Sequence, residues 1–420
     1  LDDLTQQGYA FYNAIPEFTA PAFEVKEVFG ELSIPILKDL PFAHALTITG
    51  SGRVADYNNA VGTVFAWSAG VDYAPIPDLR FRGSYSKSIR SPNLSELFST
   101  QSQNFAPGFS DPCSARNIGT GSNTRAANCA AAGRPANYDF VYVQSLEIVS
   151  GGNPNLRQEE GISYTIGGVF EPTFFPGFSI SVDYYDVAVK DVITSVAAQT
   201  IVNQCYDLAT LDNQFCALFQ RAGAGGGPNG EEAFRILEGS LLQSTLNFAK
   251  LKARGIDTNI SYRQNFDWGN VVLSGIWTRV LQRDSFTNPT DPNRINRLLY
   301  ELGNPRDQVN VNARVGIGNV RFGYELRWID KMYLNTYEDF NSLQGRPAEN
   351  PDYAPFQFYP DVWYHNIRAD VDVNDKFNLY LGIDNVTNQL PPLGLTGVGA
   401  GSGIYDVRGR YGYIGFVAKF

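Results

Sequence analysis

Apolar and polar residues alternate at every second position through much of this chain, and the last ten residues show the pattern clearly. Alternation with a period of two is typical of a β-strand that has one apolar face. In the segment 411–420 the apolar face carries Ile414, Phe416, Ala418 and Phe420. Lys419 lies on the opposite face. The sequence therefore predicts a strand at its C-terminal end.

The same alternation predicts twelve further strands upstream, separated by Gly, Pro, Asn and Asp residues that favour turns. In the segment 79–86, for example, Phe81 and Tyr85 lie on one face and Arg82 on the other. Each predicted strand therefore has one apolar and one polar face, as in an antiparallel sheet. The thirteen strands are expected at about 24–37, 45–54, 65–73, 79–86, 162–170, 178–184, 256–262, 271–281, 309–315, 320–328, 367–373, 377–383 and 411–420.

Short and long connections alternate along these strands. Short turns follow residues 36, 73, 170, 262, 315 and 373. The long connections cover about 90–156, 191–247, 284–305, 331–361 and 387–404. In an antiparallel meander this order places every long connection on one rim, which is the arrangement of transmembrane barrels. A soluble sandwich or propeller gives no reason for such segregation, so we expect an all-β, antiparallel transmembrane β-barrel.

Composition agrees with this prediction. Only 18% of the residues are charged, 13% are aromatic, and no run of 18 apolar residues occurs, so the sequence excludes a helical membrane protein. The formal net charge of −10, without any basic cluster in the sequence, argues against a nucleic-acid-binding protein.

The four cysteines form two near pairs in irregular sequence, Cys113 with Cys129 and Cys205 with Cys216. Neither pair has the spacing of a metal site, so we expect loop disulfides in an oxidising compartment. The alternative is four reduced thiols without a special role.

Counting strands back from the terminus assigns directions. The last strand runs from the long-loop rim to the short-turn rim, so the C-terminus is expected in the periplasm and the long loops outside the cell. Thirteen is odd, whereas bacterial single-chain barrels have even strand numbers. Residues 1–23 are therefore interpreted as the end of an extracellular loop, and 24–420 as the C-terminal part of a larger barrel. The chain starts without Met or a signal peptide.

Four ordered segments resemble the TonB-dependent outer-membrane receptors. They are Arg90-Ser-Pro-Asn-Leu-Ser-Glu-Leu-Phe98, Gly152–Gly167 with its Asn-Pro-Asn-Leu-Arg-Gln-Glu start, Asp183–Ile193, and Asp384-Asn-Val-Thr-Asn388. The final strand, ending in Phe420, is similar to the closing strand and assembly signal of such barrels. The resemblance implies the last 13 strands of a 22-stranded barrel in the outer membrane, assembled by the barrel-assembly machinery. It also implies a plug and a TonB-interacting region that this sequence does not contain.

Ligand contacts are expected from the long-loop rim, where aromatic rings occur beside amides and carboxylates. The alternative is that these rings pack the loops together or form the interfacial girdle. The candidates are Tyr138, Tyr142, Tyr206, Phe215, Tyr333, Tyr337, Asn341, Tyr353 and Phe356.

Catalytic chemistry finds little support. The two histidines, His44 and His365, are far apart in strand order, and the glycine-rich tract 223–230 lacks the Lys-Ser/Thr of a phosphate loop. Glu159 and Glu160 are expected to face the hydrated lumen rather than to act as acid and base. We therefore expect neither an enzyme nor a metal or cofactor site.

The resemblance implies active uptake of a scarce nutrient, with TonB, the nutrient and outer-membrane lipid as partners. The loop with Cys205 and Cys216 resembles loops in receptors that take up carbohydrates, so carbohydrate is favoured over siderophore or cobalamin. The alternative is a structural or adhesive barrel that has no plug and binds a partner through its external loops.

Overall fold

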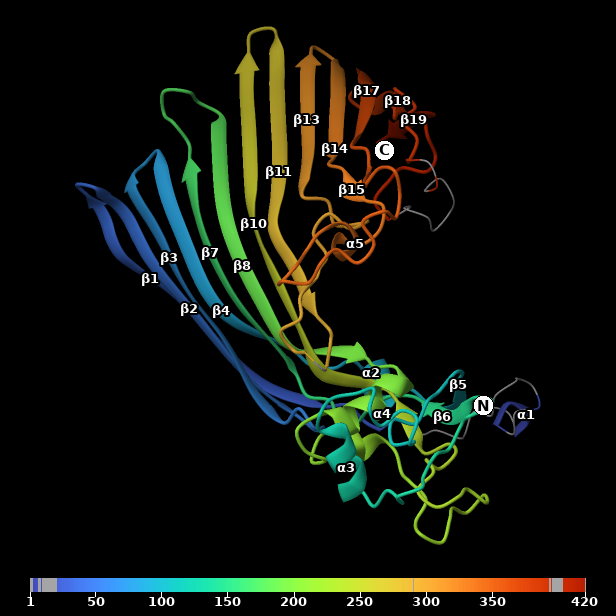
Figure 1. Ribbon diagram of the computed structural model, residues 1–420. Coiled ribbons are helices and arrows are strands. Elements are labelled where there is room, and N and C mark those ends of the chain that lie inside the picture. The colour runs from blue at the N-terminus through green and yellow to red at the C-terminus, as the bar shows by residue number, and fades with distance from the viewer. Residues whose placement is uncertain are drawn as a thin grey trace.

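The computed structural model describes residues 3–6, 9, 21–289, 291–392, 394 and 403–419, and its main element is one large antiparallel sheet (Figure 1). Neighbouring strands follow one another along the chain, so the sheet is a meander. Its strands are β1 (Val25–Leu40), β2 (Ala43–Tyr57), β3 (Thr63–Ile76), β4 (Leu79–Arg90), β7 (Glu159–Phe170), β8 (Phe178–Ser195), β10 (Thr245–Phe266), β11 (Gly269–Phe286), β13 (Asp307–Ile317), β14 (Val320–Ile329), β17 (Val362–Asn374), β18 (Phe377–Asp384) and β19 (Tyr411–Ala418), with the short β12 (Asn296–Arg297) beside β11.

The thirteen strands predicted from alternation are confirmed in number and order. Their boundaries differ, because the ladders extend further than the alternation does. At β1 the register shifts between Pro35 and Leu37, and pairing with β2 then continues to Leu40 opposite Ala43. The turn therefore falls at residues 41–42, where Phe42 has a positive φ of 58°, and not directly after residue 36.

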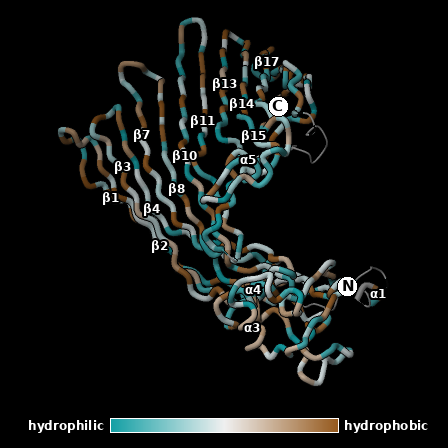
Figure 2. Tube along the Cα trace, viewed as in Figure 1, coloured by the Kyte–Doolittle hydropathy of each residue, from teal (hydrophilic) through white to brown (hydrophobic). Residues whose placement is uncertain are grey.

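The two faces of the sheet differ in polarity, and Figure 2 shows the alternation of hydrophilic and hydrophobic residues along the strands. On the polar face Arg82 donates hydrogen bonds of 2.7 and 2.6 Å to Asp183, and the hydroxyls of Ser84 and Thr165 are 2.8 Å apart. On the other face apolar side chains such as Ile166 are exposed. In a transmembrane barrel the apolar face contacts lipid and the polar face lines the lumen.

The sheet is curved and open (Figure 1). Among the described residues β1 pairs only with β2, and β19 pairs only with β18. The described sheet therefore has two edges, as expected for a part of a larger barrel. The apolar face of β19 carries Ile414 and Phe416, each 74% exposed, whereas Phe420 lies outside the described residues.

Short turns and long loops lie at opposite ends of the strands, as predicted (Figure 1). One connection on the long-loop rim is nevertheless short, because β2 and β3 are joined by residues 58–62 alone. There Gly62 has a positive φ of 60° and Val61 packs with Ala55 and Val64 in a small buried cluster. Every long loop therefore lies on the expected rim, but that rim also has one tight turn.

The long loops contain regular structure that the sequence did not predict. They form α2 (Leu94–Phe98), β5 (Ser102–Ala106), α3 (Arg125–Ala131), β6 (Leu146–Ser150), α4 (Ala198–Asp207), η1 (Cys216–Leu218), β9 (Leu241–Gln243), β15 (Met332–Tyr333), α5 (Tyr337–Phe340) and β16 (Phe358–Tyr359); α1 (Asp3–Gln6) precedes the sheet. No helix within the described ranges is long and apolar enough to cross a membrane.

Candidate ligand-binding loops

The two longest connections, residues 91–158 and 196–244, fold together into one body, which we call the loop unit. Its sheet joins both segments, since β6 pairs antiparallel with β5 and parallel with β9, with Ile148 opposite Leu241. Contacts also join α3 to α4 across the two segments. A ligand that reaches this part of the rim therefore meets a folded surface rather than two independent loops.

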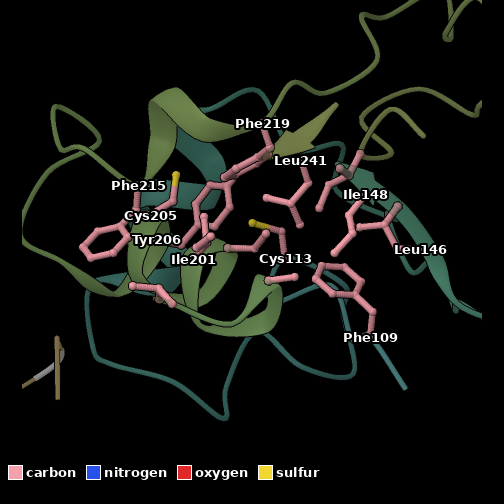
Figure 3. Close-up of a cluster of buried hydrophobic side chains, with 14 of the residues drawn as sticks. Phe109, Cys113, Leu146, Ile148, Ile201, Cys205, Tyr206, Phe215, Phe219 and Leu241 are labelled. Atoms are coloured by element: carbon pink, nitrogen blue, oxygen red, sulfur yellow. The ribbon is translucent and has the colours of Figure 1, made fainter. Parts of the chain in front are cut away.

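The loop unit has its own hydrophobic core, shown in Figure 3. Buried aromatic and aliphatic side chains from both connections meet there, including Phe109, Ile148, Ile201, Tyr206 and Leu241. The two expected disulfides are part of this core: Cys113 is bonded to Cys129 and Cys205 to Cys216. The prediction of paired loop cysteines is therefore confirmed.

A buried ion pair joins the two connections inside the loop unit. Arg221 donates hydrogen bonds of 2.7 and 2.8 Å to the two carboxylate oxygens of Asp111, whose side chain is fully buried. The Tyr138 hydroxyl donates a 2.6 Å bond to Asp111, and the Nε of Arg221 donates to the hydroxyl of Tyr206. The guanidinium also lies 4.3 Å from the ring centroid of Phe234, within range of a cation–π contact.

The pKa values of this group follow from burial and charge. Burial alone would raise the pKa of the Asp111 carboxyl, but the hydrogen bonds and charge of Arg221 lower it below its usual range. Burial, and then the negative charge of Asp111, raise the pKa of Tyr138 far above that of a free phenol. The arrangement therefore holds one ionised pair and a neutral tyrosine in the interior.

A second ion pair ties the helices of the loop unit. Arg125 at the start of α3 donates a 2.7 Å hydrogen bond from Nε to Asp207 at the end of α4, and both side chains are more than nine-tenths buried. Asn128 donates to the carbonyl oxygens of Tyr206 and Leu208. The C-terminal carbonyls of α4 are thereby satisfied by side chains of the other connection.

A second group of packed loops lies over β11, β14 and β17. The ring of Tyr333 stacks on those of Phe340 and Phe358, with centroids 5.5 and 4.5 Å apart. Asn341 donates a 2.9 Å hydrogen bond to the Tyr333 hydroxyl. Arg297 in β12 bonds the buried carboxylate of Asp284 at 3.1 Å. This group, like the loop unit, has an interior of its own.

The candidate ligand residues therefore differ widely in accessibility. The fully buried ones are Tyr138, Tyr206, Phe215 and Tyr333. The half-buried ones are Tyr142, Tyr337 and Asn341. Tyr353 and Phe356 are 49% and 61% exposed. The buried rings pack the loops against one another, which is the alternative given in the sequence analysis. Ligand contact stays a prediction for all nine residues.

A cavity that sequence reasoning missed lies between the loop unit and the ends of β8 and β10. It has a volume of about 690 Å³ and is lined by amide and aliphatic side chains together with the charged residues Arg157 and Asp191. The lining includes Gln101, Asn155, Gln158, Gln214 and Leu218. The polar residues in the segment 153–158, directly before a strand, are the feature of the sequence that could have indicated this cavity. Amides beside aliphatic side chains suit a ligand with many hydroxyl or carbonyl groups.

An arginine fixes the junction between strand and loop. Arg90 at the end of β4 bonds Glu159 at the start of β7 and Glu96 in α2. Asn93 and Glu96 cap α2 reciprocally, with 2.8 Å bonds between each side chain and the other residue's backbone N–H.

Glu160 corrects a prediction. Adjacent residues of a strand point to opposite faces, so Glu159 and Glu160 cannot both face the lumen. Glu159 bonds Arg90 on the polar face, whereas Glu160 pairs with Lys87 and Lys190 on the face that carries the exposed apolar residues.

The two histidines and the glycine-rich tract make contacts within the fold. His365 in β17 shares a 2.8 Å hydrogen bond with Tyr324, and His44 in β2 lies 3.4 Å from Asp39 at a short turn. The tract 223–230 forms turns in the loop unit. Within the part of the chain that the structure describes, no group of three or more His, Cys, Asp or Glu side chains could hold a metal ion.

A curved meander with one apolar face, one polar face and folded loops on a single rim is the architecture of a transmembrane β-barrel wall. The family model described as "TonB dependent receptor-like, beta-barrel" matches residues 2–386, and the chain belongs to this family. Receptors of this family reside in the outer membrane. The resemblance found in the sequence is therefore confirmed.

Solved receptor structures share the fold. The ferric enterobactin receptor of Pseudomonas aeruginosa is 15% identical with a TM-score of 0.59, and the match covers 95% of this chain and 45% of that one. The siderophore receptor PirA of Acinetobacter baumannii is 12% identical with a TM-score of 0.57, covering 94% and 46%. The chain thus spans about half the length of these receptors. No curated protein sequence matches it.

Proposed function

We propose that this chain is the C-terminal barrel portion of a receptor that takes up a scarce nutrient across the outer membrane. The observation that carries the proposal is the family match over residues 2–386. Residues 24–420 would form the barrel wall and its loops, and residues 1–23 the end of an extracellular loop. Energy would come from the TonB complex through a region of the full-length protein outside this chain.

The proposed orientation places the long loops outside the cell and the C-terminus in the periplasm. Two structural features support it. All long loops share one rim, as in barrels with short periplasmic turns. These loops also fold into packed bodies with buried ion pairs and disulfides, whereas the periplasmic turns of such barrels are short.

We further propose that the ligand is a carbohydrate, in preference to a siderophore or cobalamin. The amide-lined cavity and the exposed rings of Tyr353 and Phe356 support this choice. Rings stack on the apolar faces of sugars, while amides donate to and accept from hydroxyl groups. The likeness to siderophore receptors is a likeness of fold, since those chains are only 12–15% identical.

Binding and uptake by the full-length protein test these proposals separately. Purified receptor is titrated with neutral oligosaccharides, a ferric catecholate and cobalamin, and growth on the ligand that binds is compared in cells with and without TonB. We expect an oligosaccharide to bind and growth on it to require TonB. Tighter binding of the ferric catecholate or cobalamin would contradict the carbohydrate assignment. Binding without TonB-dependent growth would contradict uptake and favour the adhesive alternative.

A further inference from the structure

A second cavity, with a volume of about 390 Å³, lies between the loop unit and the connection that follows β11. It is lined by the polar face of α4 and the end of β8, by Phe248 of β10, and by residues 287–289. We call it the α4 cavity. It shares no lining residue with the amide-lined cavity described above, so the two are separate sites.

The helix α4 has two faces with different environments. Its apolar residues Ile201, Cys205 and Tyr206 belong to the hydrophobic core of the loop unit (Figure 3). Its polar residues are spaced by three or four positions, which places them on one face of the helix. All of them line the α4 cavity: Thr200, Asn203, Gln204 and Asp207. The packed core therefore fixes the position of the polar groups in the cavity wall.

Phe248 supplies an aromatic ring to the α4 cavity. The pairing of β10 with β8 shifts register between Asn247 and Ala249, so Phe248 is an extra residue without a partner in the ladder. Bulges of this kind redirect a side chain away from its regular position. The ring is half-buried, packs against the core of the loop unit and also lines the cavity. It is thus an anchored apolar surface, on which the face of a sugar ring can stack.

Polar groups of the lining are available to a ligand. The Oδ1 atom of Asn203 accepts a 3.0 Å hydrogen bond from Gln199, and this bond fixes the orientation of the Asn203 amide. Within the described residues, the Nδ2 of Asn203 and the hydroxyls of Thr200 and Thr287 have no hydrogen-bond partner. The amide nitrogen donates two hydrogen bonds, and each hydroxyl both donates and accepts. These groups match the hydroxyls of a sugar, which also donate and accept.

The charge in the lining of the α4 cavity is already compensated. Among its lining residues only Asp207 has a charged side chain, and this carboxylate accepts hydrogen bonds from Arg125 and from the backbone N–H of Ser122. The amide-lined cavity differs, because Arg157 and Asp191 belong to its lining. The α4 cavity therefore presents hydroxyl and amide groups beside an aromatic ring, without an uncompensated charge.

We propose that the α4 cavity binds a neutral sugar unit, with Phe248 stacked on the sugar ring and Thr200 and Asn203 bonded to its hydroxyls. The inference rests on the proposed carbohydrate ligand and adds the place and the charge of a sugar unit that the receptor binds. The volume of 390 Å³ lies within the range of small-molecule sites, about 300–1,000 Å³. An anionic sugar would find no free cation in the lining, because Arg125 is bonded to Asp207.

The test measures binding of oligosaccharides to the full-length receptor by isothermal titration calorimetry. The neutral probes are maltopentaose, cellopentaose and xylopentaose, and trigalacturonate is the anionic probe. We expect a neutral probe to bind, and trigalacturonate to bind at least tenfold more weakly than that probe. Titration of the variants with the same neutral probe then locates the site.

Two conservative substitutions test the polar and the aromatic contact. Asn203→Asp keeps the oxygen that accepts from Gln199 but removes the amide donors and adds a charge, so affinity for the neutral probe should fall at least tenfold. Phe248→Leu keeps an apolar side chain against the core but removes the ring, and should weaken binding several-fold. The matched controls, Asn123→Asp and Phe105→Leu, change exposed residues of the loop unit outside the cavity and should bind like the unchanged receptor.

A third variant fills the cavity from an exposed position. Ala197→Trp places a large side chain on the lining without replacing a core residue, and should abolish binding. Hydrogen exchange of α4 checks that the loop unit of each variant is folded.

The outcomes separate this site from the proposed function. Unchanged affinity of the folded variants would overturn the site and leave the carbohydrate ligand standing. Equal losses in the controls, or trigalacturonate bound as tightly as the neutral probe, would also overturn the site. If none of the neutral probes binds, both the carbohydrate ligand and the site are wrong. Binding that depends on the α4 cavity without TonB-dependent growth would contradict uptake alone.

Discussion

Arg221 and Asp111 are 110 residues apart in the chain, yet they form a two-bond ion pair in the interior of the loop unit. Each belongs to a different long connection, so the pair joins two loops that leave the barrel at different strands. Such a pair requires both connections to be folded around it, since an isolated buried charge is strongly unfavourable. The loop unit is therefore expected to fold and unfold as one body.

Removing one partner should unfold the loop unit while the barrel stays intact. Arg221→Ala leaves the Asp111 carboxylate buried and uncompensated, and breaking a buried pair in this way costs about 3–5 kcal/mol. We expect hydrogen exchange across both connections to accelerate, with β7 and β8 unchanged. The matched control is Arg116→Ala, which removes an ion pair to Asp139 between more exposed side chains. Equal effects of the two substitutions would refute the role given to burial.

The loop unit should lose stability in alkaline solution above about pH 10. Burial raises the pKa of Tyr138, Tyr142 and Tyr206, and the charge of Asp111 adds to each of these shifts. Unfolded tyrosine ionises near pH 10 while the folded phenols keep their protons, so the stabilisation is complete below pH 10 and declines above it. Hydrogen exchange of the loop unit, corrected for its intrinsic pH dependence, measures this. The substitution Tyr142→Phe should reduce the decline.

In acid the loop unit should lose stability as the pH falls, the opposite direction to its loss in alkaline solution. Burial raises the pKa of the Asp111 and Asp207 carboxyls, but their arginine partners lower it by more, so both pKa values lie below the usual range. Their stabilisation is present above the unfolded carboxyl pKa of about 3.9 and is lost as pH falls through the lower folded values. We therefore expect constant protection of the loop unit from about pH 5 to 9. Loss of protection at pH 6 would show that another group controls it.

The disulfides should matter for the loop unit and not for the barrel wall. The bond between Cys113 and Cys129 closes a loop of 16 residues, for which the chain-entropy model gives about 3 kcal/mol. Replacing both cysteines by serine should make the loop unit sensitive to a protease at concentrations that leave the original protein uncut. Heat-dependent gel migration reports on the barrel and should not change. A destabilised barrel would contradict the independence of the two parts.

The barrel wall was predictable because its signal is local. A strand such as β4 repeats its environment every two residues, so Phe81 and Arg82 reveal the two faces without knowledge of their neighbours. The order of thirteen strands then follows from an antiparallel meander, in which each strand pairs with the next. Register shifts, as at Pro35 in β1, were not predictable, because they depend on the partner strand.

The structure of the loops was not predictable either, because it also depends on partners that are distant in the sequence. Asp111 finds Arg221, and Arg125 finds Asp207, over separations of 110 and 82 residues, without any periodic pattern. Aromatic residues in such loops can serve packing or ligand contact, and only burial distinguishes the two roles. The cluster of Lys87 and Lys190 around Glu160 likewise requires the strand register, which a single sequence does not provide.

The exposed face of β19 should act during assembly rather than in the finished barrel. Phe416 is 74% exposed and contributes little to packing within the described chain. Phe416→Ser, made in the full-length protein, is expected to reduce the amount of barrel in the outer membrane severalfold. Val373→Ser is the control, since Val373 is 64% exposed on β17, which is separated from β19 by β18. An equal reduction by both would show that exposed apolar area, not the terminal strand, controls assembly.

The exposed and buried aromatics of the fourth long loop should separate binding from stability. Tyr353→Ala with Phe356→Ala removes rings that are mostly accessible, so ligand affinity should fall, by about 1 kcal/mol or more for each stacked ring, while the loop keeps its fold. Tyr333→Ala removes a ring stacked on Phe340 and Phe358 and should instead accelerate hydrogen exchange of that loop. Isothermal titration and hydrogen exchange on the same samples distinguish these effects. If the double variant binds the ligand unchanged, the ligand contacts lie elsewhere on the rim, and the amide-lined cavity becomes the first place to test, with Gln214→Ala as the substitution.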